Sequence, residues 1–541
     1  MRSRIALITI AASAAASLLA ACEKPGGYFG TTEPKHGTGE LWVNNGGEPD
    51  FLDPGRAATS NASTILQNIF EGLTRFDPRT LETEPGMAER WEISDDKKVY
   101  TFHLRNGARW SDGRPLTAHD FVYSWRRVLD PRTGSKYASQ LFVLANGEAF
   151  HKGRAPAEAV GVRAMDDHTL RVDLQDPIPF FIPLITHLYT MWPVPRWVVE
   201  RFDGTSRPER WTLPENIVTN GPYRFVEWQF RHRMIFEKSP HYWDAANVRM
   251  KRVVSYEVES YATTLNLYKA GEIDYIGENT SLPSELMSLL RTKRDYVHAP
   301  YLSVYFYWIN TKQKPLDDPR VRRALNMAID KQALCDYVKR GGEIPATTIT
   351  PPGLAGYEPP DGDPYDPKRA RALLGEAGFP DGRGFPGFTL VYNTSEGHKL
   401  IAETIQQMWK RELGIDVAIE NQEWQVYVKR LETMEFQMAR MGWVGDYADP
   451  YTFLEIFSPD SGNNHSNWKD PAFKSLLDAG NAQLDPRARY ARFRDAERAM
   501  LDVLPIIPLY VYTRSYLVKP YVKGIWPNLM DKHPWRAMWI E

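Results

Sequence analysis

Strand-like and helix-like patterns alternate along the whole chain, and this alternation restricts the possible fold more than any other feature of the sequence. Residues 99–104 are rich in β-branched and aromatic side chains, which predicts a strand. Thr117 and Asp120 form a capping-box-like helix start, and apolar residues at helical spacing follow as far as Pro131. Because such elements interleave to the end of the chain, we predict a mixed α/β fold with more than one sheet.

The same patterns place further elements along the chain. They predict strands at 41–44, 170–174, 388–392 and 415–419, and helices around 65–73, 319–329 and 401–409. Five prolines and many aromatics between residues 176 and 195 indicate a connection between lobes rather than the interior of an element. A chain of 541 residues is too long for one ordinary core, so we expect two or three lobes.

The charge balance and the cysteine content argue against several classes of function. The formal net charge is -2 at pH 7, and the lack of a basic surplus argues against nucleic acid as a partner. The chain has two cysteines, Cys22 and Cys335, which are poor material for a disulfide framework or for a zinc site of thiolates. We therefore expect no metal, no cofactor and no redox chemistry.

The N-terminus has the pattern of an export signal. Arg2 and Arg4 precede an apolar, alanine-rich run over residues 5–21 that is too short to be a convincing membrane span. It ends in Leu-Ala-Ala-Cys, which resembles the bacterial lipobox, in which the cysteine is acylated and becomes the first residue of the mature protein. We predict a signal peptide at 1–22, a lipid anchor at Cys22 and a flexible polar tether at 23–40. The alternative is a soluble secreted protein with an incidental cysteine.

The sequence contains no convincing enzyme motif. Gly382, Gly384 and Gly387 fit G-x-G-x-x-G literally, but this stretch precedes a strand-like segment and contains a proline, so we interpret it as a turn. H-E-x-x-H, a Walker lysine loop and a G-x-S-x-G elbow are all absent from the sequence. Carboxylates are abundant, but no pair of them stands out. We expect that the protein is not an enzyme, with a periplasmic hydrolase as a remote alternative.

The stretch from Ala439 to Pro450 concentrates charged and aromatic side chains. Arg440 and Asp446 are opposite charges six residues apart, which corresponds to roughly 20 Å on an extended segment. Such a pair could hold the two ends of a zwitterion, and the alternative is a surface loop with two solvated charges. Residues 301–308 carry aromatic side chains on both faces of a strand, so one face is a candidate cavity wall.

A series of motifs extends over nearly the whole mature chain. They are Asn68–Leu73, Tyr100–Arg105, Trp110–Gly113, Asp120–Trp125, Asn220–Tyr223, Asp317–Asp330, Tyr392–Ser395 with His398, and the stretch around Asp446. In this order they resemble the oligopeptide-binding proteins of bacterial peptide ABC importers, within the larger peptide and nickel substrate-binding group.

This resemblance implies a two-lobed, hinged α/β fold of the periplasmic-binding-protein type with a third, inserted domain. By analogy, the first lobe is discontinuous and contains residues 41–70, 196–302 and 514–541. The inserted domain comprises residues 71–195, and the second, closing lobe comprises residues 303–513.

The resemblance also implies that an extended peptide binds between the lobes by β-augmentation. Asp446 matches the family's carboxylate for the peptide α-ammonium group. Arg440 and His398 match positions near the C-terminal end of the peptide, where a guanidinium suits a carboxylate. The residues expected to line side-chain pockets are Trp424, Trp443, Tyr301, Phe306 and Tyr512. The residues expected to offer backbone groups are Gly442 and Val444.

At three positions the sequence departs from the family pattern, which limits how far the family's binding roles can be assigned to this chain. Leu431 stands where some relatives have a second ligand-facing arginine, which leaves the preferred peptide length open. Ala58 occupies a position that can be acidic, so a preference for basic side chains there could be lost. Some relatives join two strands by a disulfide whose positions here are Ser303 and Val444, so both cysteines are absent.

The function implied by the resemblance is capture of short peptides and their delivery to the membrane permease of an ABC importer. We expect a monomer outside the cytoplasm, in the periplasm or cell envelope, held at the membrane by lipidated Cys22. A murein peptide, a sugar or a metal chelate is the alternative ligand for the same fold.

Overall fold

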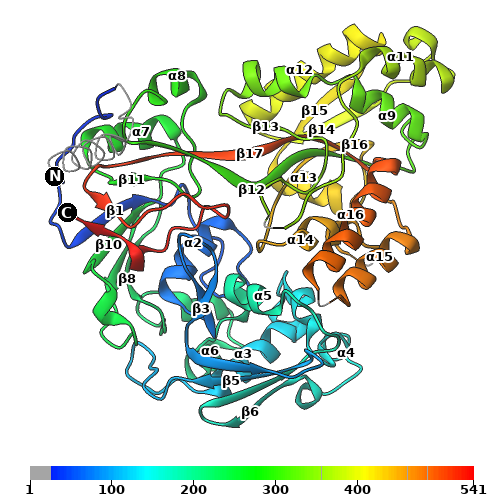
Figure 1. Cartoon of the computed structure of the whole chain (residues 1–541). Helices are drawn as coiled ribbons and strands as arrows, with labels where there is room; N and C mark the ends of the chain where they lie inside the picture. The colour runs from blue at the N-terminus through cyan, green and yellow to red at the C-terminus, as the bar shows by residue number, and fades with distance from the viewer. Residues whose placement is uncertain (1–25, 355, 460, 484) are drawn as a thin grey trace, which may run out of the picture.

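One long sheet extends through most of the molecule and carries the other elements (Figure 1). The computed structural model describes residues 26–541 except 355, 460 and 484. Within this part, the sheet has eleven strands in the order β15-β14-β16-β12-β17-β11-β1-β10-β9-β8, with β13 paired to β17. Their bounds are β1 (Glu40–Asn44), β8 (Tyr223–Gln229), β9 (Arg233–Lys238), β10 (Arg252–Tyr256), β11 (Tyr275–Ile276), β12 (Tyr296–Ile309), β13 (Ile344–Pro345), β14 (Thr389–Asn393), β15 (Ala418–Gln422), β16 (Met438–Val444) and β17 (Ile506–Val518).

Strands β12 and β17 connect the two ends of this sheet. They contain 14 and 13 residues and pair with each other; β12 also pairs with β16 of the second lobe, and β17 pairs with β11 and β13. We call strands β1 and β8–β11, with the helices packed on them, the first lobe, and β13–β16 with their helices the second lobe. The register between β12 and β17 is interrupted between Pro300 and Val304, midway between the lobes.

Helices cover both faces of the sheet in the second lobe (Figure 1). One face packs against α9 (Pro319–Met327), α11 (Pro367–Glu376) and α12 (Glu396–Leu413). The other packs against α13 (Trp424–Glu432), α14 (Tyr451–Leu454), α15 (Pro471–Asn481) and α16 (Pro486–Val503). Short α10 (Lys331–Ala333) follows α9.

The aromatic side chains of β12 alternate between these two helix-covered cores. Tyr305 and Tyr307 belong to one core, whereas Phe306 and Trp308 belong to the other. The interpretation of one face of this strand as a cavity wall is therefore wrong for residues 304–308. The physical reason is that a central strand in a three-layer arrangement is buried on both faces.

The first lobe packs helices on two sides of its part of the sheet. Helix α2 (Ser60–Ile69) contributes to the large core, and its first turn is capped by the Thr59 side chain, which accepts a hydrogen bond from the Ala62 N–H. Helices α7 (Tyr261–Ala270) and α8 (Met287–Leu290) enclose a smaller core. Near the C-terminus, β18 (Val522–Lys523) pairs with β19 (Trp539–Ile540).

A second sheet, of four strands among the described residues, lies below the first lobe in the view of Figure 1. Its order is β4-β5-β7-β6, and we call it, with its helices, the inserted domain. The bounds are β4 (Ala88–Ile93), β5 (Val99–Leu104), β6 (Val162–Asp166), β7 (Thr169–Asp173), α3 (Ala118–Leu129), α4 (Gly147–His151) and α5 (Phe181–His187). Strands β2 (Thr74–Phe76) and β3 (Thr83–Pro85) pair beside it, and α6 (Arg196–Phe202) follows.

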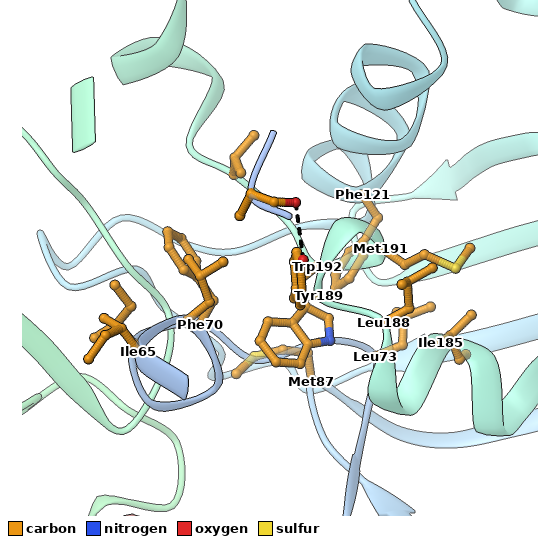
Figure 2. Close-up of a cluster of buried hydrophobic side chains, with 14 of the residues drawn as sticks. Ile65, Phe70, Leu73, Met87, Phe121, Ile185, Leu188, Tyr189, Met191 and Trp192 are labelled. Carbon is orange, nitrogen blue, oxygen red and sulfur yellow. Dashed lines mark hydrogen bonds between the residues drawn. The ribbon is translucent and has the colours of Figure 1, made fainter. Parts of the chain in front are cut away.

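The inserted domain shares its hydrophobic core with the first lobe. Figure 2 shows Ile65 and Phe70 beside Met87, Phe121 and Trp192 in one buried cluster. The residue bounds given above for the lobes and the inserted domain stay predictions, but the continuous core indicates that the first lobe and the inserted domain form one stable unit.

Several sequence-based predictions of elements are confirmed. Strand β5 spans the predicted residues 99–104, and α3 begins with the predicted capping box of Thr117 and Asp120. The G-x-G-x-x-G stretch precedes β14, which confirms its interpretation as a turn.

Two predictions of elements are wrong. The strand placed at 415–419 begins at Ala418, because the buried side chains of Ile415 and Val417 point inward from the loop that follows α12. The segment 176–195 contains α5, in which Pro183 lies in the first turn, where a missing N–H breaks no helical hydrogen bond.

The described part of the predicted tether contacts the first lobe. The Phe29 N–H donates to the Asp295 carboxylate at 3.0 Å, and the Lys519 ammonium donates to the Thr31 carbonyl at 2.8 Å. The prediction of a flexible tether is therefore wrong for residues 26–40. A polar, glycine-rich composition does not prevent docking, because backbone groups can supply the hydrogen bonds.

The predicted signal peptide and Cys22 lie outside the described residues. Within residues 26–541, the described helices include none that is long and apolar enough to cross a membrane.

A buried ion pair ties the first lobe to the inserted domain. The Arg127 guanidinium of α3 donates to both oxygens of Asp53, at 2.9 and 2.6 Å, and Asp53 also accepts a hydrogen bond from the Trp211 indole at 3.2 Å. We expect Arg127→Met to lower the free energy of unfolding by about 3 kcal/mol, because it leaves a buried carboxylate without its partner. Urea unfolding followed by tryptophan fluorescence measures this.

The matched control for this experiment is Arg132→Met. The Arg132 side chain is 91% exposed beside Asp130, so we expect its loss to change the free energy of unfolding by less than about 1 kcal/mol. Equal effects of the two substitutions would contradict a structural role for the buried pair.

Candidate functional site

Two adjoining cavities lie between the first and second lobes, and residues of the inserted domain also line the larger one. Their volumes are about 370 and 570 Å³. The residues that line both are Thr280, Ser281, Tyr301, Gly442, Val444 and Arg514. Because they share a wall, we treat the two cavities as one cleft. Arg440 lines the smaller cavity and Asp446 the larger one.

Strand β16 presents a free edge to this cleft. It pairs with β12 from Met438 to Val444, whereas β14 pairs on the other side only with Met438 and Ala439. The Gly445 N–H donates to the Leu302 carbonyl on the β12 side. Because backbone groups alternate in direction along an antiparallel pair, those of Gly442 and Val444 point away from β12. Among the described strands none covers this part of the edge, so it can accept an added strand.

Arg440 stands at one end of this edge with its charge unmatched. Its guanidinium donates to the Tyr512 hydroxyl at 2.9 Å and to the Asn393 side-chain oxygen at 3.3 Å, and it lies over the Tyr305 ring at 4.7 Å. Its Nε has no hydrogen-bond partner, and no carboxylate in the described part of the chain forms an ion pair with it. A guanidinium in this state suits a carboxylate ligand.

His398 supports this end of the cleft from outside the cavity. Its Nδ1 lies 3.4 Å from the Tyr305 hydroxyl. Burial lowers the pKa of His398 to about 3, and the positive charges of Arg440 and Lys339 act in the same direction. The imidazole is therefore neutral at pH 7 and adds no charge to that of Arg440.

Asp446 stands at the other end of the edge, just beyond β16. Its backbone N–H donates to the Thr452 hydroxyl at 3.1 Å, which fixes the position of the residue. Within the described residues, no group donates a hydrogen bond to its carboxylate. Burial raises the pKa of Asp446 to about 6, although the charge of Lys532 opposes this shift. The carboxylate is thus ionised at pH 7 but lacks a direct partner, which favours binding of an ammonium group.

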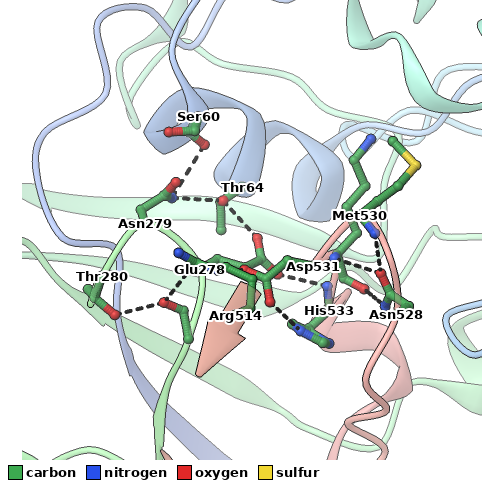
Figure 3. Close-up of polar contacts among 12 residues, drawn as sticks. Ser60, Thr64, Glu278, Asn279, Thr280, Arg514, Asn528, Met530, Asp531 and His533 are labelled. Atoms are coloured by element: carbon green, nitrogen blue, oxygen red, sulfur yellow. Dashed lines mark hydrogen bonds and ion pairs between the residues drawn. The ribbon is translucent and has the colours of Figure 1, made fainter. Parts of the chain in front are cut away.

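A polar network from the C-terminal segment forms the floor of the larger cavity (Figure 3). Arg514 pairs with Asp531, which also contacts the His533 ring at 3.1 Å. The Glu278 carboxylate accepts hydrogen bonds from the Thr64 hydroxyl at 2.8 Å and from the backbone N–H of His533 at 2.7 Å. These buried groups bond to one another, although the Nδ1 atom of His533 has no hydrogen-bond partner, and the network holds the first-lobe wall of the cleft in place.

The other predicted site residues divide into two sets. Tyr301, Trp443 and Tyr512 line the cleft, as do Gly442 and Val444. Phe306 is fully buried in the core of the second lobe, and Trp424 on α13 is 51% exposed and lines neither cavity. The structure therefore brings together most of the predicted set, but neither Phe306 nor Trp424 contributes to the cleft wall.

The positions that depart from the family pattern are also placed by the structure. Ser303 and Val444 lie directly opposite each other in the pairing of β12 with β16, which is the arrangement expected of two bridged positions. Leu431 is buried in the second-lobe core, and Ala58 lines the larger cavity.

Sequence reasoning missed several charged residues of the cleft. Lys339 and Glu343 line the smaller cavity, and Glu278 and Lys532 line the larger one. The run Asp-Lys-His at 531–533 concentrates titratable residues near the C-terminus, but nothing local in it indicates a place in the cleft. Within the described residues, no group of three or more His, Cys, Asp and Glu side chains could hold a metal ion.

Comparison with known proteins gives consistent matches. Residues 82–465 match the family model described as "Bacterial extracellular solute-binding proteins, family 5 Middle". The periplasmic oligopeptide-binding protein OppA of Salmonella typhimurium is 39% identical over 533 residues, 97% of this chain and 95% of the relative. The periplasmic murein peptide-binding protein MppA of Escherichia coli is 35% identical over 488 residues, 88% of each chain.

Solved structures agree with these sequence matches. A periplasmic oligopeptide-binding protein of Borrelia burgdorferi superposes with a TM-score of 0.83 at 33% identity, covering 93% of this chain and 100% of that one. Haemophilus influenzae OppA in complex with RPPGFSPFR gives 0.82 at 32% identity, covering 93% and 99%. The expected two-lobed α/β fold of a periplasmic peptide-binding protein is thereby confirmed.

The raised pKa of Asp446 predicts a pH-dependent stability of the ligand-free protein. An aspartate in the unfolded chain titrates near 3.9, so the folded state loses stability as the pH rises from about 4 to about 6 and the buried carboxylate ionises. We expect Asp446→Asn to raise the free energy of unfolding by about 1 kcal/mol at pH 7.5, because it removes the ionised carboxylate; partial solvation of this group keeps the gain small. At pH 4 the substitution should leave the free energy of unfolding unchanged. Thermal denaturation at both pH values measures this.

Glu435→Gln serves as the control, since Glu435 is exposed. It should shift the melting temperature equally at both pH values. A destabilising effect of Asp446→Asn at pH 7.5 would show that the carboxylate has a stabilising partner in the empty cleft.

Proposed function

The chain belongs to family 5 of the bacterial extracellular solute-binding proteins, and we propose that it captures short peptides in the cleft and delivers them to the permease of an ABC importer. The observation that carries this proposal is the free edge of β16, which lies between an unpaired guanidinium and a carboxylate without a direct partner. Opposite charges at the two ends of an accessible strand edge match the two ends of a zwitterionic peptide. The relatives that bind oligopeptides support this assignment.

In this proposal the peptide adds a strand to β16. Its main chain exchanges hydrogen bonds with Gly442 and Val444, its α-ammonium group pairs with Asp446, and its carboxylate pairs with Arg440. These contacts involve no side chain of the peptide, so they are compatible with many sequences. Tyr301, Trp443 and Tyr512 then bound the space that the side chains occupy.

Closure of the cleft is a motion of the second lobe about β12 and β17. The cleft wall includes Thr280 and Ser281 on the first-lobe side and residues 440–446 on the second-lobe side. A peptide contacts both sides only when the lobes are together, so binding shifts the equilibrium towards the closed form. The closed form is the state that the permease recognises.

The N-terminal sequence supports a location at the membrane, outside the cytoplasm. The signal-like run and the lipobox resemblance at 19–22 support acylation of Cys22. The relatives described as periplasmic support an extracytoplasmic protein.

Asp446 provides the direct test of peptide capture. We expect wild-type protein to bind Ala-Ala-Ala, and its N-acetylated form to bind at least about 3 kcal/mol more weakly, because acetylation removes the positive charge that Asp446 requires. We expect Asp446→Ala to weaken binding of Ala-Ala-Ala by a similar amount and to remove most of the difference between the two peptides. Isothermal titration calorimetry at pH 7.5 measures both effects.

Glu435→Gln is again the matched control, since it removes an exposed carboxylate distant from the cleft lining. Equal affinity of the wild-type protein for free and acetylated peptide would refute the role of Asp446. Steady hydrolysis of the peptide during titration would instead support an enzyme.

Lipidation makes a separate prediction. In a bacterial host that processes lipoproteins, we expect wild-type protein in the membrane fraction and Cys22→Ser in the soluble fraction, because the thiol is the acylation site. Fractionation followed by immunoblotting distinguishes them. Cys335→Ser is the control, and it should leave the distribution unchanged. A soluble wild-type protein would favour the alternative of a secreted protein without an anchor.

A further inference from the structure

Lys532 brings a positive charge into the larger cavity, next to the proposed site of the peptide α-ammonium group. Its ammonium donates to the His187 carbonyl at 3.3 Å and lies 5.8 Å from the centre of the Phe76 ring. The described residues include no carboxylate that pairs with it directly. Burial lowers the pKa of Lys532 to about 8, and the charges of Asp446 and Glu278 only partly offset this effect.

The other charged groups of the cavity are matched more fully than Lys532. Arg514 is paired with Asp531. Glu278 accepts hydrogen bonds from a hydroxyl, an amide side chain and a backbone N–H. Burial holds the pKa of His187 well below its ordinary value, so this imidazole is neutral. Lys532 and Asp446 are therefore the two cavity charges that have no direct partner of their own.

Peptide binding changes the balance between these two charges. In the empty cleft, Asp446 is the carboxylate that most offsets the charge of Lys532. When the α-ammonium group of a peptide occupies Asp446, two cations share one carboxylate. The ammonium of Lys532 then faces net repulsion from the ligand, and an additional anion in the cavity would relieve it.

We propose that Lys532 is a specificity-determining residue that favours peptides with an acidic side chain at the first or second position and disfavours basic ones there. This inference rests on the proposed function, because it requires the α-ammonium group at Asp446. Lys532 retains free N–H donors for a carboxylate, since one described hydrogen bond occupies its ammonium group. Ala58, in the same cavity, adds no negative charge that would attract a basic side chain.

The geometry of the cleft determines which residues of the peptide lie near Lys532. Asp446 and Lys532 line the larger cavity together, whereas Arg440 and Lys339 line the smaller one. In an extended peptide each residue advances by about 3.3 Å, and successive side chains point to opposite faces. The first two side chains therefore remain in the larger cavity on either face, and the third lies towards the smaller cavity.

The test compares tripeptides that differ in charge at a single position. Ala-Ala-Ala, with Asp, Asn or Lys placed at position 1, 2 or 3, is titrated into wild-type protein, Lys532→Met and Lys532→Arg by calorimetry at pH 7. At one of the first two positions, we expect Asp to bind wild-type protein about tenfold more tightly than Asn, which has the same shape, and Lys to bind more weakly than Asn. In Lys532→Met, the ratio of the affinity for the Asp peptide to that for the Asn peptide (the Asp/Asn ratio) should approach one. In Lys532→Arg, the wild-type ratio should persist.

Each outcome decides the inference. Equal binding of Asp and Asn peptides by wild-type protein at both positions overturns it, and so does a ratio that Lys532→Met leaves unchanged. If Lys532→Met fails to fold, the wild-type protein and Lys532→Arg still give the ratio. Ala-Ala-Ala and its acetylated form separate the two proposals: failure of both to bind refutes the peptide-binding function, whereas normal binding of Ala-Ala-Ala with an Asp/Asn ratio of one refutes only the role of Lys532.

Discussion

The pairing of β12 with β17 is the constraint on which the rest of the structure depends. These two strands extend the sheet of the first lobe into the second, and they place β16, with its free edge, beside the junction. Their register is broken at residues 301–303, where Tyr301 lines the cleft. The irregular stretch and the cleft lining thus coincide, and a stretch without regular ladder bonds can bend and can also leave space for a ligand.

Along the free edge of β16, the charged side chains stand at the two ends and not between them. Arg440 and Asp446 stand at either end of the exposed part of β16, and residues 441–445 between them carry no charge. Leaving these side chains without direct partners costs free energy of folding, and the hydrogen bonds and packing of the surrounding fold offset this cost. A ligand that matches both ends recovers that cost, whereas a ligand with one charged end recovers only part of it.

The sequence predicts local features better than relations between distant segments. The capping box of α3 and the extent of β5 depend on neighbouring residues, and both are confirmed. A local family motif was enough to assign Arg440 and Asp446 to one site, because both residues lie on the same segment of the chain. Phe306 could not be assigned in this way, since the helices that cover its face of β12 lie more than fifty residues away in the sequence. Lys532 was missed for the same reason, because it reaches the cleft from the C-terminal segment.

The docking of residues 26–40 has a consequence for how the molecule would work when it is held by its N-terminus. Phe29 and Thr31 are bonded to Asp295 and Lys519. The beginning of the described chain lies beside the first lobe, remote from the second-lobe helices (Figure 1). Any restraint applied to the beginning of the described chain therefore acts on the larger unit formed by the first lobe and the inserted domain. The second lobe alone would swing, and the stationary unit would keep a constant orientation towards whatever surface restrains it.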